Sequence, residues 1–215
     1  MSELVLASQS PRRRELFRLL GLDFHAISTD IDESQHFGEL PEPFVRRLSR
    51  EKARAARHLL PDMPALILAA DTIVVAGSVV LGKPADAAEA RMILNLLRGQ
   101  RHDVITALTL LEPATGRELT HVVRTPVMMR SYTDAEIEAY IETGDPYDKA
   151  GAYAIQHSGF NPAEPLNHCY ANVMGLPLCH LHLMLQAFGV PSAQGIALRC
   201  RMHLTYPCPI ADTVL

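Results

Sequence analysis

Hydrophobic residues along the chain follow two periods, one typical of strands and one typical of amphipathic helices. Apolar runs predict strands at 3–7 and about 24–29, a hairpin over 65–81 turning at Gly77-Ser78, and strands at about 103–111 and 118–129. Apolar stripes at helical spacing predict helices from Pro11 to Gly21, over 43–60 before Pro61, from Asp86 to Gly99, from Thr133 to Gly144, and over about 177–188. Such alternation with short connections predicts an α/β or α+β fold with a mixed sheet.

Length and composition narrow the class of protein. A chain of 215 residues favours one compact domain or two lobes around a single cleft, and 48% hydrophobic residues predict a packed core. A net charge of −4 argues against the excess of basic residues that nucleic-acid-binding proteins need. No apolar run approaches the roughly 18 residues that a membrane-spanning helix requires. The arginines near the N-terminus follow the short apolar stretch, unlike a secretory signal. We therefore expect a soluble cytoplasmic protein without nucleic-acid or membrane partners.

The last quarter of the chain differs from the rest. Residues 190–215 contain three prolines and no clear hydrophobic period, which indicates a C-terminal tail of unknown role after a domain over 1–189. All four cysteines, Cys169, Cys179, Cys200 and Cys208, lie at or near this end, with no CxxC pair and none of the usual zinc spacings. Free thiols are the preferred interpretation, and a Cys200–Cys208 disulfide is the alternative.

Three consecutive arginines occupy an unfavourable place in the first predicted helix. Arg12, Arg13 and Arg14 fall in its opening turn, where the helix dipole already carries partial positive charge. A bound anion would reverse the sign of that effect. Free backbone N–H groups, the hydroxyls of Ser8 and Ser10, and the arginine guanidinium groups would together hold a phosphate. The alternative is a solvated basic turn.

Asp71 interrupts the apolar run of the 65–81 hairpin. Aspartate is a poor strand former, and an ionised carboxylate among apolar residues must be paired, bind a metal or have a shifted pKa. A structural ion pair, a metal ligand and a general base are therefore all open, and perturbed carboxylates concentrate in active sites.

Lysine is rare in this chain and occurs in unusual settings. Of 20 basic residues only Lys52, Lys83 and Lys149 are lysines, so each is a candidate for a role that needs a compact point charge. Lys52 falls on the inward stripe of the 43–60 helix with Val45, Leu48, Ala55, Ala56 and Leu59, where it can snorkel outward or reach into a cleft. Lys83 and Lys149 lie in glycine-containing loops that a ligand can approach.

An acidic loop adds candidate metal ligands. Asp30, Asp32 and Glu33 form an ordinary hydrated turn if considered alone. Beside a phosphate site and Asp71 they become candidate ligands for Mg²⁺, which takes a few carboxylates together with substrate phosphate oxygens. Phosphate donors, carboxylates and lysines together indicate metal-assisted cleavage of a phosphoanhydride.

Six short motifs occur in a familiar order over about residues 3–188. They are Leu6-Ala7-Ser8-Gln9-Ser10-Pro11-Arg12-Arg13, Glu51-Lys52-Ala53, Ala70-Asp71-Thr72, Gly82-Lys83-Pro84, Gly144-Asp145-Pro146 with Asp148-Lys149-Ala150-Gly151-Ala152-Tyr153, and Asn172-Val173-Met174-Gly175-Leu176-Pro177. Each is weak alone, but together they make the chain resemble the Maf family of nucleotide pyrophosphatases.

The resemblance implies a two-lobed α/β fold of the Maf/ITPase-like type, with a mixed twisted sheet, flanking helices and a central cleft. It implies a cytoplasmic homodimer that hydrolyses a nucleoside triphosphate to the monophosphate and pyrophosphate with Mg²⁺ or Mn²⁺. Carried over by position, Ser8, Ser10, Arg12 and Arg13 match the phosphate-binding motif, and Asp71 matches the proton acceptor. Glu33, Lys52 and Lys83 match further active-site positions. Our hypothesis, separate from the resemblance, is that Glu33 holds the metal, with Asp71 as either a second ligand or the base, and Lys149 is a further substrate-binding candidate.

Three positions separate branches of the family. Arg12, Thr72 and Gln156 resemble the dTTP/UTP pyrophosphatase branch rather than the 7-methyl-GTP branch, and an amide such as Gln156 can pair with a pyrimidine edge. The segment 157–168 departs from the family pattern at Pro162, Ala163 and His168, and it is expected to flank the cleft. A 7-methyl-GTP pyrophosphatase and a non-catalytic nucleotide-binding regulator of cell division are the alternatives.

Overall fold

A six-stranded mixed sheet forms the centre of the molecule. The computed structural model describes residues 3–60 and 65–215. The strands are β1 (Glu3–Ala7), β2 (His25–Ile27), β3 (Ala65–Ala76), β4 (Val79–Leu81), β5 (Arg101–Glu112) and β6 (Arg117–Met128). Their order is β2-β1-β3-β5-β6, with β4 on β3; β1 pairs in parallel with β2 and β3, and the other pairs are antiparallel. The expected mixed α/β sheet is confirmed.

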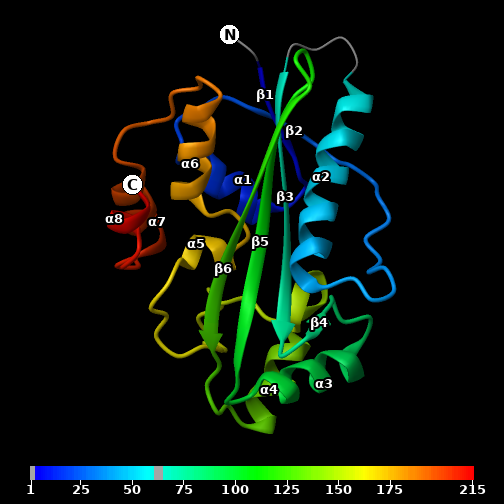
Figure 1. Ribbon diagram of the computed structural model, residues 1–215. Coiled ribbons are helices and arrows are strands. Elements are labelled where there is room, and N and C mark those ends of the chain that lie inside the picture. Colours follow the sequence, from blue (N-terminus) through cyan, green and yellow to red (C-terminus); the bar gives the residue numbers. More distant parts are fainter. Residues whose placement is uncertain (1–2, 61–64) are drawn as a thin grey trace.

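Helices cover both faces of this sheet (Figure 1). Helix α2 (Pro41–Leu59) lies on one face, and α1 (Pro11–Arg18), α5 (Tyr170–Val173) and α6 (Leu178–Ala187) lie on the other. Helices α3 (Ala87–Leu97) and α4 (Asp134–Glu142) pack at the far end of the long strands, with the short turns η1 (Asp145–Asp148) and η2 (Ala150–Ala152). The three twelve-residue strands β3, β5 and β6 therefore run through both ends of the molecule.

Local sequence signals fix the starts of three helices, α1, α3 and α4. Ser10 accepts a hydrogen bond from the Arg13 backbone N–H, and Asp86 caps α3 in the same way. Thr133 and Glu136 form the expected reciprocal capping box of α4. All the predicted strands and helices are present, with ends that differ by a few residues. Pro61, the predicted stop of the second helix, lies outside the described residues.

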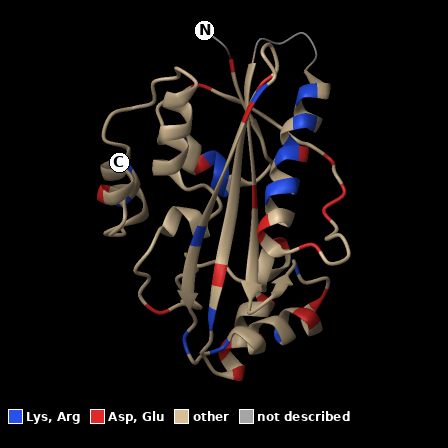
Figure 2. Cartoon of the chain, in the orientation of Figure 1, with Lys and Arg blue, Asp and Glu red and all other residues tan. Residues whose placement is uncertain are grey.

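The buried stripe of α2 differs in part from the expected one. Val45, Leu48, Lys52 and Ala56 are buried as predicted, but Ala55 is only half-buried and Leu59 is 59% exposed. The face of α2 that packs on β3 and β5 instead includes Phe44, Ser49 and Ala53, which are buried. Several arginines of α2, whose basic residues are blue in Figure 2, are paired with carboxylates, and Arg50 and Arg54 share Glu118. The positive charge of this helix is therefore partly neutralised.

Residues 190–215 contain helices that the sequence did not reveal. Helix α7 (Ile196–Leu204) and the short α8 (Ala211–Val214) pack beside α6. Ala193 donates its N–H to the Leu20 carbonyl at 2.7 Å, and His203 lies 3.0 Å from Glu15 of α1. Only two residues of α7 are buried, so it has no pronounced apolar stripe. The tail is thereby attached to α1 and α6.

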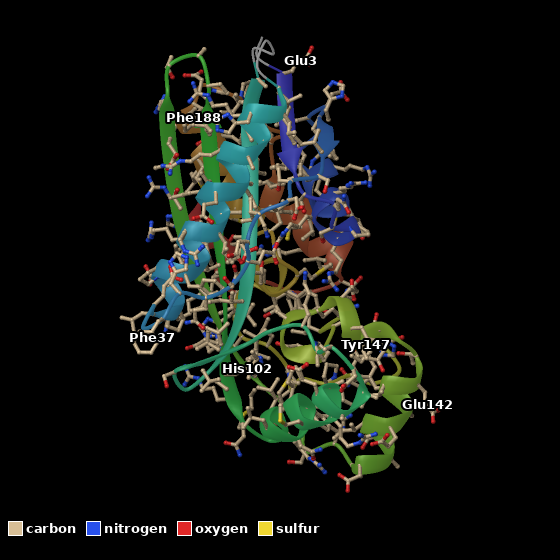
Figure 3. The ribbon with its side chains drawn as sticks, turned by 90° about the vertical axis from the view of Figure 1, so that its right-hand side faces the viewer. Glu3, Phe37, His102, Glu142, Tyr147 and Phe188 are labelled. Atoms are coloured by element: carbon tan, nitrogen blue, oxygen red, sulfur yellow. The ribbon has the colours of Figure 1, made fainter. Side chains whose placement is uncertain are left out.

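A buried histidine lies in the end of the molecule formed by α3 and α4 (Figure 3). His102 on β5 is 2% exposed, and its Nε2 lies 2.7 Å from the Tyr153 hydroxyl. Burial lowers the pKa of His102 to about 4, because no neighbouring acid compensates for the desolvation of the imidazolium. The neutral side chain is therefore part of the folded core.

Among residues 3–60 and 65–215, no helix combines the length and apolar character required to cross a membrane.

Candidate active site

One cleft brings the predicted site residues together. It has a volume of about 660 Å³, within the range of small-molecule sites. Apart from Asp30 and Asp32 of the acidic loop, its lining includes the candidate residues of the sequence prediction: Ser8, Ser10, Arg12, Arg13, Glu33, Lys52, Asp71, Thr72, Lys83, Lys149 and Gln156. These residues come from the turn after β1, α1, the segment before α2, α2, β3, the segment after β4, and the turns after α4. Val173, Met174 and Gly175 of the last motif also line the cleft, so the chain folds all six motifs around it.

The cleft is more positive than the chain as a whole. Five cationic side chains and three carboxylates line it, although the net charge of the protein is −4. Clustering of cations in a walled cleft concentrates anionic ligands there. Burial acts to lower the pKa of Arg13, while the charges of Asp71 and Glu33 act against this effect. Arginine remains a cation under these conditions.

Lys52 connects the two carboxylates of the cleft. Its ammonium is 2.7 Å from Glu33 Oε1 and contacts Asp71 Oδ1 directly. Lys52 and Asp71 are both buried, whereas the Glu33 side chain is 49% exposed. Burial acts to raise the pKa of Glu33, but the hydrogen bond and charge of Lys52 outweigh it and hold this pKa below its ordinary value. The carboxylate that interrupts the apolar strand β3 is therefore paired with a buried cation, which is one of the three possibilities that the sequence left open for Asp71.

A chain of hydroxyl groups holds Arg13 against the sheet. Arg13 Nη2 donates to Thr72 Oγ1 at 2.9 Å, and Thr72 Oγ1 lies 3.0 Å from Thr106 Oγ1. Thr106 donates to the Asn172 carbonyl at 3.1 Å, so its own oxygen is the acceptor for Thr72. Sequence reasoning missed Thr106, because a threonine on a buried strand carries no signal until the pairing of β3 with β5 is known.

Gly175 completes the seat of Arg13. Its carbonyl accepts a hydrogen bond from Arg13 Nε at 3.0 Å. The residue has φ +98°, and an added Cβ would approach Thr72 Oγ1 to 3.1 Å and Arg13 Nε to 3.2 Å. Glycine is therefore required here both by backbone conformation and by the close approach of the guanidinium.

The acidic loop contributes one residue to the cleft. Asp30 and Asp32 do not line it, and Asp32 Oδ1 instead accepts the Ser34 N–H at 2.9 Å, as in an ordinary turn. Glu33 alone of the three faces the cleft. Arg47 of α2 fixes this segment by donating to the Ser34 carbonyl at 2.8 Å.

Lys83 and Lys149, the two lysines in loops, differ in how freely their charges could reach a bound ligand. Lys83 has an exposed side chain, with Nζ 4.0 Å from Glu33 Oε2. Lys149 is buried, and its ammonium donates to Asp145 Oδ1 at 2.9 Å and to Asp148 Oδ1 at 2.5 Å. The charge of Lys149 is therefore neutralised inside its own turn, which its two ion pairs stabilise.

Gln156 lies at the edge of the cleft with an exposed side chain. Within the part of the chain that the structure describes, its amide forms no hydrogen bond. Residues 157–168, which were expected to flank the cleft, follow directly on Gln156, and none of them lines it. Arg130 instead donates its N–H to the Pro162 carbonyl, and Ala163 bridges to Met129, so this segment packs along the end of β6.

The carboxylates fit a hard divalent cation held jointly with a ligand. Glu33 and Asp71 supply oxygen donors on two sides of one cationic position, now filled by the Lys52 ammonium. No group of three or more His, Cys, Asp or Glu side chains suited to a metal occurs among the described residues. Mg²⁺ and Mn²⁺ are commonly held by one or two carboxylates together with phosphate oxygens, so two carboxylates fit such a site.

Fold and cleft describe an α/β protein with a cleft rich in cationic side chains, and comparison with known proteins identifies the family. The model of the Maf-like protein family matches residues 3–188. The chain belongs to the Maf family.

Curated relatives cover most of the chain. A dTTP/UTP pyrophosphatase of Anaeromyxobacter dehalogenans (strain 2CP-1 / ATCC BAA-258) is 50% identical over 190 residues, which is 87% of this chain and 95% of the relative. Two further relatives have the same name. The protein of Syntrophus aciditrophicus is 44% identical over 193 residues, which is 90% of this chain and 93% of the relative. The protein of Myxococcus xanthus is 46% identical over 188 residues, which is 87% of this chain and 93% of the relative. The family match ends before α7, so the tail lies beyond it.

Proposed function

We propose that this protein hydrolyses nucleoside triphosphates, with dTTP and UTP preferred, to the nucleoside monophosphate and pyrophosphate. The observation that carries the proposal is the position of Ser8, Ser10 and Arg13 at the start of α1, in the same cleft as Asp71 and Lys52. The names of the curated relatives support the same reaction.

The proposed roles follow from charge and position. The amides and hydroxyls at the start of α1, together with Arg12, Arg13 and Lys83, bind the triphosphate. Water attacks the α-phosphorus, its proton passes to Asp71, and the bond from that phosphorus to the α–β bridging oxygen breaks. Pyrophosphate leaves with the bridging oxygen, and the cations offset the charge that develops on it.

Lys52 has a positioning part in this scheme. Its ammonium fixes the Asp71 carboxylate on the sheet and links it to Glu33. Glu33 and Asp71 would hold Mg²⁺ or Mn²⁺, which when bound supplies neutralisation of phosphate charge. Asp71 as proton acceptor and Asp71 as direct metal ligand are competing roles, and metal titration of an Asp71 variant separates them.

Gln156 is the proposed base-recognition residue. Its amide offers a donor and an acceptor, which match the carbonyl and N3–H of uracil and thymine. We also propose a cytoplasmic homodimer, as in the family pattern that the six motifs match.

The reaction is tested by incubating the protein with dTTP, UTP, CTP, GTP and 7-methyl-GTP in the presence of Mg²⁺ or Mn²⁺ and measuring monophosphate and pyrophosphate. Equimolar products with fastest turnover of dTTP and UTP are expected. Preference for 7-methyl-GTP would contradict the proposed substrate. Nucleotide binding without pyrophosphate release would contradict the enzyme and favour a regulatory protein.

A further inference from the structure

The four cysteines of the chain converge on one small cavity that is separate from the candidate active site. Cys169 precedes α5, Cys179 lies in α6, Cys200 lies in α7, and Cys208 lies between α7 and α8. All four thiols are free and buried, and all four residues line the same cavity. Their spacing in sequence gave no sign of this arrangement, because the helices of the tail bring them together.

Two of these residues, Cys169 and Cys208, come from opposite sides of the tail boundary at 190 and share the wall of this cavity. A side-chain hydrogen bond between them is the largest cause that separates their pKa values. The pair differs from the Cys200–Cys208 pair that the sequence suggested as an alternative. Two thiols that line one small cavity are close enough in the fold to be candidates for a disulfide.

The surroundings of Cys208 favour its thiolate. Backbone N–H groups of Ile210 and Ala211 also donate to the Cys208 sulfur, and Arg201 is nearby. The hydrogen bond from Cys169, assisted by these groups, lowers the pKa of Cys208 below its ordinary value, whereas the same contact and burial raise the pKa of Cys169. One partner is therefore suited to attack and the other to follow.

The backbone on both sides of the pair is fixed. Arg201 donates to the Cys208 carbonyl from Nη2 at 2.9 Å and from Nε at 3.2 Å. The Tyr206 hydroxyl donates to the His168 carbonyl at 3.0 Å, next to Cys169. The tail is thus already docked against the start of α5 in the reduced protein, and a disulfide would require little rearrangement.

We propose that Cys169 and Cys208 form a peroxide-reactive dithiol site that is oxidised to an intramolecular disulfide. The Cys208 sulfur attacks a hydroperoxide, the O–O bond breaks, and a sulfenic acid forms with release of an alcohol, or of water from hydrogen peroxide. The Cys169 sulfur then attacks the sulfenic sulfur, and its proton leaves with the hydroxyl group as water. Two thiols and one hydroperoxide thus give one disulfide, one alcohol and one water.

The disulfide would covalently join the tail to α5. This helix leads directly to Gly175, whose carbonyl holds Arg13. Closing a loop between residues 169 and 208 restricts the unfolded chain, so the oxidised protein should unfold at a higher temperature.

The test uses the full-length protein, reduced and freed of reductant, and then treated with a small excess of hydrogen peroxide. Free thiols are counted after denaturation, and the mass is measured. Trypsin leaves Cys169 and Cys179 together in peptide 150–199 and Cys208 in peptide 202–215. Chymotrypsin also cuts after Tyr170 and so separates Cys169 from Cys179, which shows which of the two is cross-linked. We expect loss of two of the four thiols and a cross-link between Cys169 and Cys208.

Matched variants decide the assignment. Cys200→Ser removes a thiol of the same cavity and should keep both the cross-link and the rise in unfolding temperature. Cys208→Ser should lose both and leave Cys169 free, and circular dichroism before oxidation checks that each variant is folded. No thiol loss in the folded protein, a Cys200–Cys208 cross-link, or conversion of Cys208 only to higher oxides would overturn the proposal.

Discussion

Replacement of Asp71 by Asn tests the central residue of the proposed mechanism. Asparagine has nearly the same shape, so the pairing of residue 71 with Ala107 in the sheet is retained. Loss of a general base lowers kcat by about 10²–10⁴-fold, which corresponds to about 3–5 kcal/mol in the activation barrier. We expect kcat to fall by at least this range.

The same substitution has a limited effect on stability, because Lys52 keeps a second partner. Its ammonium lies 2.7 Å from Glu33 in the unsubstituted protein, and this ion pair does not depend on the Asp71 charge. Removing one partner of a buried pair costs about 3–5 kcal/mol when it isolates the other charge, and here the charge is not isolated. The free energy of unfolding, measured in urea, should therefore fall by less than that amount.

The assay measures pyrophosphate release at saturating dTTP over a series of Mg²⁺ concentrations. If Asp71 accepts the proton, kcat falls while the metal concentration for half-maximal rate stays unchanged; if it binds metal, that concentration rises. Asp148→Asn is the matched control, since Asp148 also lines the cleft in a lysine pair but has a 70% exposed side chain. Wild-type turnover by a folded Asp71→Asn protein would refute the reasoning.

Three further predictions address the phosphate site, the seat of Arg13 and the buried histidine. Ser10→Ala should lose about 1 kcal/mol of helix-cap stability, measured by equilibrium unfolding, and should also weaken nucleotide binding. Ser10→Asp should retain the cap but repel phosphate, and so raise KM for dTTP further. Equal KM values for both variants would contradict a phosphate-binding role. Gly175→Ala should cost about 1–3 kcal/mol for its positive φ and raise KM by displacing Arg13, and an unchanged KM would show that the guanidinium does not bind substrate. His102 has a folded pKa of about 4, so the unfolded chain binds more protons than the folded one between about pH 6.5 and 4; lowering pH through this window should remove up to about 3 kcal/mol of unfolding free energy. A His102→Gln protein should show a smaller loss over the same window, and an unchanged slope in urea titrations would argue against this origin.

The sequence was sufficient for the elements whose signals are local. The capping box of Thr133 and Glu136, the turn at Gly77 and the Ser10–Pro11 helix start all depend on residues within a few positions of each other, and each occurs as predicted. The cleft residues were identified because they violate local rules: cations in a first turn and a carboxylate in an apolar strand.

Features that depend on long-range pairing were not predictable. The contact from Thr72 to Thr106 needs the β3–β5 register, which the pattern of either strand alone does not specify. The tail helices bury few residues and so lack a period, and their packing alone brings Cys169 to Cys208. In each case the information lies in the relation between segments.

The uninterrupted pairing of β3 with β5 has a consequence for how the cleft operates. The two strands pair at nine consecutive positions, from Ile67 opposite Leu111 to Val75 opposite Asp103, and Asp71 lies in the middle of this run. A hinge between the two ends of the molecule would have to break that ladder. Asp71 is therefore a stationary reference point in the protein, and any adjustment to nucleotides of different size must come from the segments that surround it.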